Sequence, residues 1–221
     1  MKRICETDVA CLKELLDRSG GAGPDTGICP VDCARWIAQE AVRGTCGKGV
    51  MCRDGMKQVF LILEDIVNGK GKAEDFDLLQ EILGVIAECA DCELSYEASR
   101  GILTLLEKYP AEFEQHIKRK ACSNLICPGC HTVHINAALC KGSGVCISVC
   151  PKNAINGGPG LFSVVLQAKC SACNRCIAVC PEHAISGAGF VKPQGPSEPA
   201  GVGSWGNTSA QDGGRRRRRR G

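Results

Sequence analysis

Residues 140–155 read CKGSGVCISVCPKNAI, and residues 170–185 read CSACNRCIAVCPEHAI. The two stretches form an internal repeat with an offset of 30 residues. The second contains Cys-x2-Cys-x2-Cys-x3-Cys-Pro, in which three thiolates on a tight loop bind one iron–sulfur cluster and the fourth reaches the cluster of the other half. Thiolates are soft ligands that suit iron, and the spacing departs from zinc-site patterns. The repeat therefore predicts a fold built around two iron–sulfur clusters.

Crossed ligation of this kind divides the cysteines into two sets. Cluster two is expected to bind the complete set of four: Cys150, Cys170, Cys173 and Cys176. Cluster one is expected to bind a set of three: Cys140, Cys146 and Cys180. Because Ser143 stands at its second ligand position, three outcomes are open: a 3Fe–4S cluster, a 4Fe–4S cluster with Ser143 or water on the fourth iron, or no cluster. The repeat resembles bacterial dicluster ferredoxins.

The chain upstream of residue 120 has a different pattern, with apolar residues at helical spacing. Helices are predicted over 31–42, 56–68, 76–90, 94–108 and 111–120. Downstream, residues 162–167 (FSVVLQ) are predicted to form a strand. The predicted fold class is α+β, with a small helical-bundle iron–sulfur domain followed by a dicluster ferredoxin-like domain.

These patterns also predict where the chain divides. The expected segments are an N-terminal extension and linker (1–30), the helical iron–sulfur domain (31–120), a Cys/His-rich connector (121–134), the dicluster domain (135–188) and a disordered tail with a poly-Arg end (189–221). The tail is rich in Gly, Pro and Ser, a composition that cannot bury a core.

A second group of cysteines lies in the helical region, beginning with CGKGVMCRDG at residues 46–55. This stretch resembles the iron–sulfur domain of the NADH-binding flavoprotein subunit of respiratory complex I. It is still more similar to the diaphorase subunit of electron-bifurcating iron-only hydrogenases, a family whose loop reads CGxCxxCRxG. The resemblance implies that three residues bind a cluster: Cys46, Cys52 and Cys92. Gly49 replaces the second cysteine, and Cys89, one helical turn before Cys92, is either the replacement ligand or an ordinary buried cysteine.

The resemblance extends to the connector, where the hydrogenase subunit has H-x5-C-x4-C between its helical domain and its dicluster ferredoxin. Here that stretch consists of His116, Cys122 and Cys127, for which the family implies a structural metal. Three thiolates and one imidazole form a zinc-binding set, so zinc is predicted with Cys29 or Cys33 as fourth ligand. The alternative is unliganded thiols. Residues 127–131 also match the C-x-x-C-H haem pattern, which we interpret as chance because the chain shows no export signal.

Charge and hydropathy limit the function classes. The chain has 27 Lys and Arg against 24 Asp and Glu; removing the six arginines at 215–220 leaves 21 basic residues and a net charge of −3. The body is therefore not expected to bind nucleic acid. With no signal-peptide core and no apolar stretch long enough to span a bilayer, the protein is expected to be cytoplasmic. No Gly-rich phosphate loop occurs, so no FMN or NAD site is expected, and the flavin domain of the family is expected to be absent.

Together these features predict relay of single electrons within a larger NADH- or hydrogen-linked oxidoreductase. Two to three 4Fe–4S clusters would carry the electrons, with one of them open to being 3Fe–4S. Expected partners are a flavoprotein, hydrogenase or dehydrogenase subunits, and soluble ferredoxin. No nucleophile or acid–base pair indicates catalysis by the chain alone. The alternatives are a redox-sensing or structural protein that retains one complete cluster, and substrate binding at an open iron corner.

Overall fold

The computed structural model describes residues 14, 17, 20–23, 27–189, 192–193 and 195–205. The poly-Arg run predicted at the end of the tail lies outside the described residues. The chain divides into two compact units, Met1–His131 and Thr132–Gly221. Within the described part of the chain, no helix is long and apolar enough to cross a membrane.

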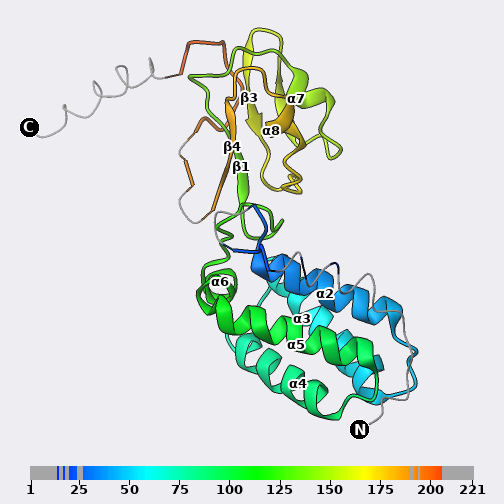
Figure 1. Ribbon diagram of the computed structural model, residues 1–221. Coiled ribbons are helices and arrows are strands. Elements are labelled where there is room, and N and C mark those ends of the chain that lie inside the picture. Colours follow the sequence, from blue (N-terminus) through cyan, green and yellow to red (C-terminus); the bar gives the residue numbers. More distant parts are fainter. Residues whose placement is uncertain are drawn as a thin grey trace, which may run out of the picture. The chain divides into compact units, whose positions relative to one another are not determined.

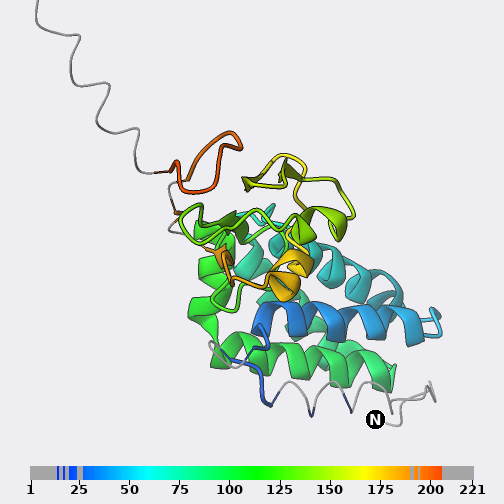
Figure 2. The same cartoon turned by 90° about the horizontal axis from the view of Figure 1, so that it is seen from above.

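The first unit is a helical bundle (Figure 1). Its helices are α2 (Pro30–Gly44), α3 (Met56–Val67), α4 (Asp75–Cys89), α5 (Glu93–Lys108) and the short α6 (Pro110–Glu114). Helix α2 packs against both α3 and α5, and α4 packs against α5. Seen from above, α2 and α5 run side by side (Figure 2). The four long helices predicted from the sequence are confirmed, each with its bounds within two residues of the prediction.

The apolar faces of these helices meet in one core. Val59, Leu63 and Ile66 lie at helical spacing on α3 and are completely buried. They belong to one cluster with Ile86 of α4 and Ile102 of α5. Each such side chain stabilises the fold by about 1.5–3 kcal/mol relative to an exposed position. Hydrophobic burial therefore stabilises the helical bundle that positions the cysteines of the first unit.

Two π-helical turns interrupt this regular pattern, and each contains a predicted ligand. The first, η1 (Met51–Gly55), precedes α3 and contains Cys52. The second, η2 (Gln115–Arg119), follows α6 and contains His116. The prediction of a regular helix over 111–120 is therefore wrong beyond Glu114. A π-turn accommodates one extra residue per turn and redirects the side chains that follow, which is why such turns are frequent at functional sites.

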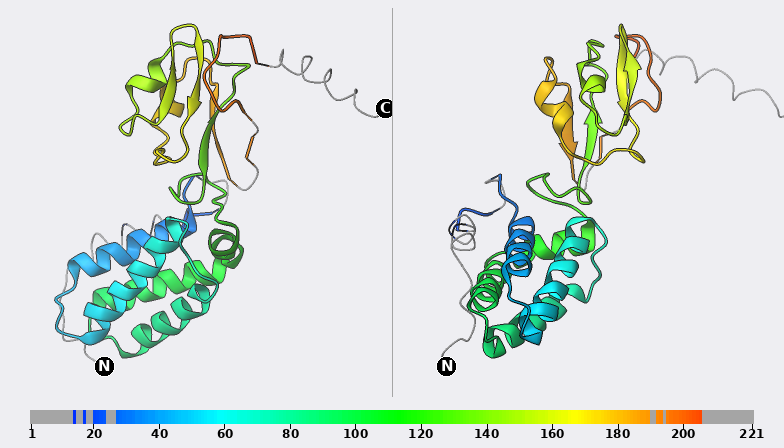
Figure 3. Two further views of the ribbon diagram at one scale, coloured as in Figure 1. Left: turned by 180° about the vertical axis from the view of Figure 1, so that it is seen from behind. Right: turned by 90° about the vertical axis from the view of Figure 1, so that its right-hand side faces the viewer.

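The second unit is small and β-rich. Strand β1 (Thr132–Ile135) pairs antiparallel with β4 (Ile185–Ala188), and β2 (Ile155–Gly158) pairs antiparallel with β3 (Leu161–Val165). Two short helices, α7 (Val145–Ser148) and α8 (Arg175–Val179), contain Cys146 and Cys176, one cysteine from each half of the repeat. These elements are seen from behind and from the side in Figure 3. The predicted mixed α+β class is confirmed, with helices first and a β-rich unit second.

The 30-residue repeat extends to the backbone. Residues with positive φ occur in three pairs that are 30 positions apart: Gly142 and Ala172, Gly144 and Asn174, and Asn153 and His183. Positive φ is uncommon outside glycine, so its recurrence at matching positions is specific. The two halves therefore fold into the same local structure.

The prediction of a disordered tail is wrong for residues 195–205. The Phe162 amide donates to the Ala200 carbonyl at 2.9 Å, and the Val202 amide donates to the Gly160 carbonyl at 3.0 Å. The Trp205 ring packs edge-to-face on Phe162, with centroids 6.4 Å apart. Composition did not reveal this segment because it gains its order from β3, with which it pairs.

Candidate metal and cluster sites

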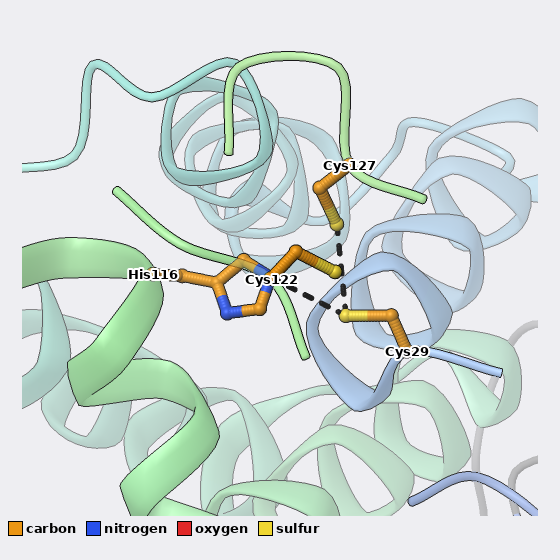
Figure 4. Close-up of side chains that lie close together, drawn as sticks. All are labelled: Cys29, His116, Cys122 and Cys127. Carbon is orange, nitrogen blue, oxygen red and sulfur yellow. Dashed lines mark hydrogen bonds between the residues drawn. The ribbon is translucent and has the colours of Figure 1, made fainter. Parts of the chain in front are cut away.

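Four donors from distant parts of the first unit form a buried centre (Figure 4). They are Cys29, His116, Cys122 and Cys127, and their ligand atoms all lie within 4.8 Å of one another. The Cys29 sulfur lies 3.4 Å from His116 Nε2 and 3.6 Å from the Cys127 sulfur. A tetrahedral zinc ion bonded to sulfur at about 2.3 Å holds its sulfurs about 3.8 Å apart. The donors are therefore spaced for a single ion.

The orientation of His116 also suits a metal. Its Nδ1 lies 2.7 Å from the Glu112 carbonyl oxygen, so Nδ1 carries the proton and donates, leaving Nε2 as the ligand atom. Metal-binding histidines commonly donate their other ring N–H in this way. The Glu112 carboxylate accepts a hydrogen bond from the Ser123 hydroxyl, and its Oε2 lies 3.8 Å from Nδ1. A second layer of contacts thus fixes the imidazole.

Crowding shifts the pKa values of these groups in opposite directions. Hydrogen bonds from the Cys127 and Cys29 thiols lower the pKa of Cys122 and favour its thiolate. Burial lowers the pKa of His116, but hydrogen bonds to Cys122 and Cys29 outweigh burial and raise that pKa to about 10. The thiolate is the form of cysteine that binds metal. The lowered pKa of Cys122 therefore favours a bound cation, whereas His116 must release its Nε2 proton when a metal binds.

Two nearby cysteines lie outside this donor set. Cys33 is one turn further along α2, and the structure brings Cys29 rather than Cys33 into the centre. The Cys130 sulfur lies 3.5 Å from the carbonyl oxygen of Ile66, and burial raises the pKa of Cys130 to about 12. Cys127 and Cys130 are both fully buried. Neither thiol of the C-x-x-C-H stretch is therefore accessible for covalent haem attachment.

A cavity of about 380 Å³ adjoins the first π-helical turn and the junction between α4 and α5. Its lining contains Gly49 and four cysteines: Cys46, Cys52, Cys89 and Cys92. Cys52 and Cys92 are buried, whereas Cys46 and Cys89 are exposed. A Cβ atom at position 49 would lie 3.4 Å from the Cys52 sulfur. Cys89 thus lines the same cavity as the three ligands that the family implies. Gly49, which replaces the family's second cysteine, lines it too.

Two small pockets in the second unit gather the cysteines of the repeat. One is lined by the set expected for cluster two: Cys150, Cys170, Cys173 and Cys176. The other is lined by the set expected for cluster one: Cys140, Ser143, Cys146 and Cys180. Each pocket contains one cysteine from the opposite half of the repeat, which is the arrangement that crossed ligation requires.

Sequence reasoning missed one polar residue in the second of these pockets. Ser163, on β3, is 2% exposed, and its hydroxyl oxygen lies 3.8 Å from the Cys146 sulfur. Burial raises the pKa of Cys146, and the contact with Ser163 opposes that rise. Burial likewise raises the pKa of Cys176, the counterpart of Cys146, to about 11. Applying the 30-residue offset to the strands as well as to the cysteines would have found Ser163, because Val133 is its counterpart.

The helical bundle with its cysteine-lined cavity, and the β-rich unit with its repeated cysteines, define a protein that binds iron–sulfur clusters. Residues 32–116 match the family described as the NADH-ubiquinone oxidoreductase-F iron-sulfur binding region. Residues 146–191 match the LdpA Fe-S cluster-binding domain. Residues 32–116 are therefore similar to the iron–sulfur region of the oxidoreductase F type, and residues 146–191 are similar to a second iron–sulfur domain. The resemblance predicted from the sequence is confirmed.

Individual relatives agree with this assignment. The NADP-reducing hydrogenase subunit HndC of Solidesulfovibrio fructosivorans is 32% identical over 149 residues, which cover 67% of this chain and 30% of that protein. The F subunit of the NADH-quinone oxidoreductase of Streptomyces coelicolor is 35% identical over 78 residues, or 35% of this chain and 17% of that protein. The 51 kDa subunit of Neurospora crassa NADH-ubiquinone oxidoreductase is 26% identical over 129 residues, or 56% and 26%. This chain spans less than a third of each relative.

Proposed function

We propose that this chain relays single electrons within a larger NADH- or hydrogen-linked oxidoreductase, between a flavoprotein and a hydrogenase, dehydrogenase or soluble ferredoxin partner. The observation that carries the proposal is the composition of the two pockets in the second unit, each of which contains a cysteine from the opposite half. Iron–sulfur clusters accept and release one electron at a time. Two relatives, a NADP-reducing hydrogenase subunit and an NADH-quinone oxidoreductase subunit, support the redox setting.

The proposed ligands follow the cysteine sets described above. In the second unit, four thiolates hold cluster two, and three thiolates with Ser143 or water hold cluster one. In the helical domain, which we assign to residues 31–120, Cys46, Cys52 and Cys92 hold a further cluster, and Cys89 replaces the ligand lost at Gly49. These residues bind and orient the clusters.

We also propose that the buried Cys/His centre holds a structural zinc ion. All four positions of a tetrahedral shell are supplied by protein side chains, so no position is left for a substrate. The ligands come from the start of α2, from η2 and from the connector that follows. Cys29 and His116 are 87 residues apart in sequence, and shared ligation would tie these segments together.

Anaerobic reconstitution of the full chain tests this function. Iron, sulfide and zinc would be quantified, and EPR spectra recorded before and after reduction with dithionite. Two or three reducible clusters with interacting signals, one zinc ion and rapid electron exchange with a flavoprotein are expected. A single reducible cluster in each chain contradicts the relay, because no internal path for electrons would remain.

The second candidate function is redox sensing or structural support with one complete cluster. Two observations favour it: Gly49 and Ser143 occupy ligand positions in two different sites. This alternative predicts a partner whose binding depends on the redox state of the chain without turnover of electrons. Comparing partner binding to the oxidised and the reduced chain separates the two functions.

A further inference from the structure

The pockets for clusters one and two can be compared position by position through the 30-residue repeat. Their buried lining keeps the same residue type where Cys146 corresponds to Cys176 and where Ile185 corresponds to Ile155. It changes type where Ser163, in the pocket for cluster one, corresponds to Val133 in the pocket for cluster two. The pocket for cluster two thus has an apolar side chain where the pocket for cluster one has a buried hydroxyl.

The Ser163 hydroxyl has one hydrogen-bond partner among the described side chains, the Cys146 sulfur at 3.8 Å. The opposite strand confines it, because a Cβ atom at Gly157 would lie only 2.6 Å from Ser163 Oγ. With a free thiol, Cys146 donates and the hydroxyl accepts. A cysteine that binds iron is a thiolate without a proton, so the hydrogen bond must then run from Ser163 to sulfur.

We propose that Ser163 donates a hydrogen bond to the Cys146 thiolate of cluster one and thereby raises the reduction potential of that cluster. The inference rests on the proposed cluster ligation of the second unit. Reduction adds one electron, whose charge spreads onto the sulfur ligands, and a donor directed at such a sulfur stabilises the more negative state. No covalent bond forms or breaks, and Ser163 keeps its proton.

This hydrogen bond gives the two halves of the repeat different redox roles. Val133 offers no donor to cluster two, so the equivalent stabilisation is missing there. The hydrogen bond therefore shifts the distribution of an electron in the second unit toward cluster one, relative to a chain without it. Ser163 acts as a positioning residue, since it influences the cluster through Cys146 and does not itself ligate iron.

Reciprocal exchange of the two residues tests the inference in the full-length, anaerobically reconstituted chain. EPR-monitored redox titration would compare wild type, Ser163→Val and Val133→Ser, with Cys140→Ser used to assign the signal of cluster one. In Ser163→Val the potential of cluster one should fall, by about 59 mV for a tenfold change in the equilibrium constant of a one-electron couple. In Val133→Ser the potential of cluster two should rise. Ser163→Thr, which keeps the hydroxyl, should retain the wild-type potential.

The possible outcomes separate this inference from the relay. If Ser163→Val disturbs assembly, Ser163→Ala removes the hydroxyl without adding bulk and should lower the same potential. If Ser163→Val and Ser163→Ala both keep full iron and sulfide content and the wild-type potential of cluster one, the inference is overturned while the relay stands. A wild-type chain that holds no cluster at Cys140 and Cys146 overturns the inference directly. A wild-type chain with only one reducible cluster overturns the relay as well.

Discussion

The Cys/His centre and the open cavity use the same kind of ligand in the same helical bundle, yet they differ in spacing and exposure. Every donor of the centre is buried, and the four ligand atoms lie within 4.8 Å of one another. The cavity has two buried and two exposed cysteines around about 380 Å³. Among the described residues, only the centre is tight enough for a single ion.

This difference follows from what each site would hold. Four ligands of one zinc ion must converge on a point, whereas cluster ligands bind separate iron atoms and stand further apart. A converging site can form part of the core, and its loss should damage the fold. A wide site at the surface can lose a ligand and still leave the bundle intact. Donor spacing, rather than cysteine content, therefore distinguishes a structural metal site from a cluster site.

The largest effect is expected at the centre. Cys122→Ala removes one of the four proposed zinc ligands and leaves the remaining donors crowded and buried. We expect loss of bound zinc and a fall of several kcal/mol in the free energy of unfolding, because the binding free energy of a structural zinc ion contributes to folding. Thermal unfolding followed by circular dichroism, with and without a zinc chelator, measures this effect. The chelator should lower the unfolding temperature of wild type and leave that of Cys122→Ala unchanged.

Cys130→Ala is the matched control for this variant. Cys130 is as buried as Cys127 and lies three residues after it, but it is outside the donor set. Its replacement should cost about 1 kcal/mol, the typical net value of a hydrogen bond, and the zinc content should stay at one ion per chain. Equal losses of stability in both variants would remove the distinction between the centre and the surrounding core.

An intermediate effect is expected at the cavity. Cys89→Ala should remove one ligand of the helical-domain cluster, because Cys89 lines the cavity with Cys46, Cys52 and Cys92. The oxidised protein should then show a three-iron EPR signal and less iron per chain. Zinc content and helix content should not change. A Cys89→Ala chain with full iron content and an unchanged spectrum would mean that Cys89 is no ligand.

Adding Gly49→Cys to the Cys89→Ala chain sharpens this test. The new side chain would begin 3.4 Å from the Cys52 sulfur, at the position where the family carries its own ligand. We expect the double variant to recover the four-iron spectrum. Recovery would establish that Cys89 compensates for the cysteine missing at position 49, and persistence of the three-iron signal would contradict this compensation.

The sequence predicted those parts of the molecule that depend on local spacing. Apolar periodicity was sufficient for the long helices, and the repeat was sufficient to predict which cysteines line each pocket of the second unit. Three members of the Cys/His centre were found because His116, Cys122 and Cys127 are close in sequence. The choice between Cys29 and Cys33 remained open, because these residues are one helical turn apart and only the packing of α2 decides which one reaches the centre.

The features that were missed depend on contacts between distant segments. Ser163 had no signal of its own, because a serine in a strand is ordinary until its counterpart in the repeat is known. Residues 195–205 have the composition of a linker, and contacts with residues 160–162, including the hydrogen bond from Val202 to Gly160, give them order. The π-helical turn at 115–119 preserves apolar spacing closely enough to be mistaken for a continuing helix.

The smallest effect is expected in the layer of residues behind the zinc ligands. Glu112→Gln keeps the shape of the side chain, and the backbone carbonyl that holds His116 Nδ1 stays in place. It removes a negative charge whose Oε2 lies 3.8 Å from that nitrogen, so the imidazole becomes a weaker base. We expect zinc affinity to fall by about tenfold, at the lower end of the range for such positions. Competition with a chelator measures the affinity.

Glu114→Gln is the matched control, because Glu114 pairs with Lys118 on the exposed surface, where an ion pair contributes about 0–1 kcal/mol. Equal affinities for the two variants would show that the ligands alone, without Glu112, determine how tightly the centre binds zinc.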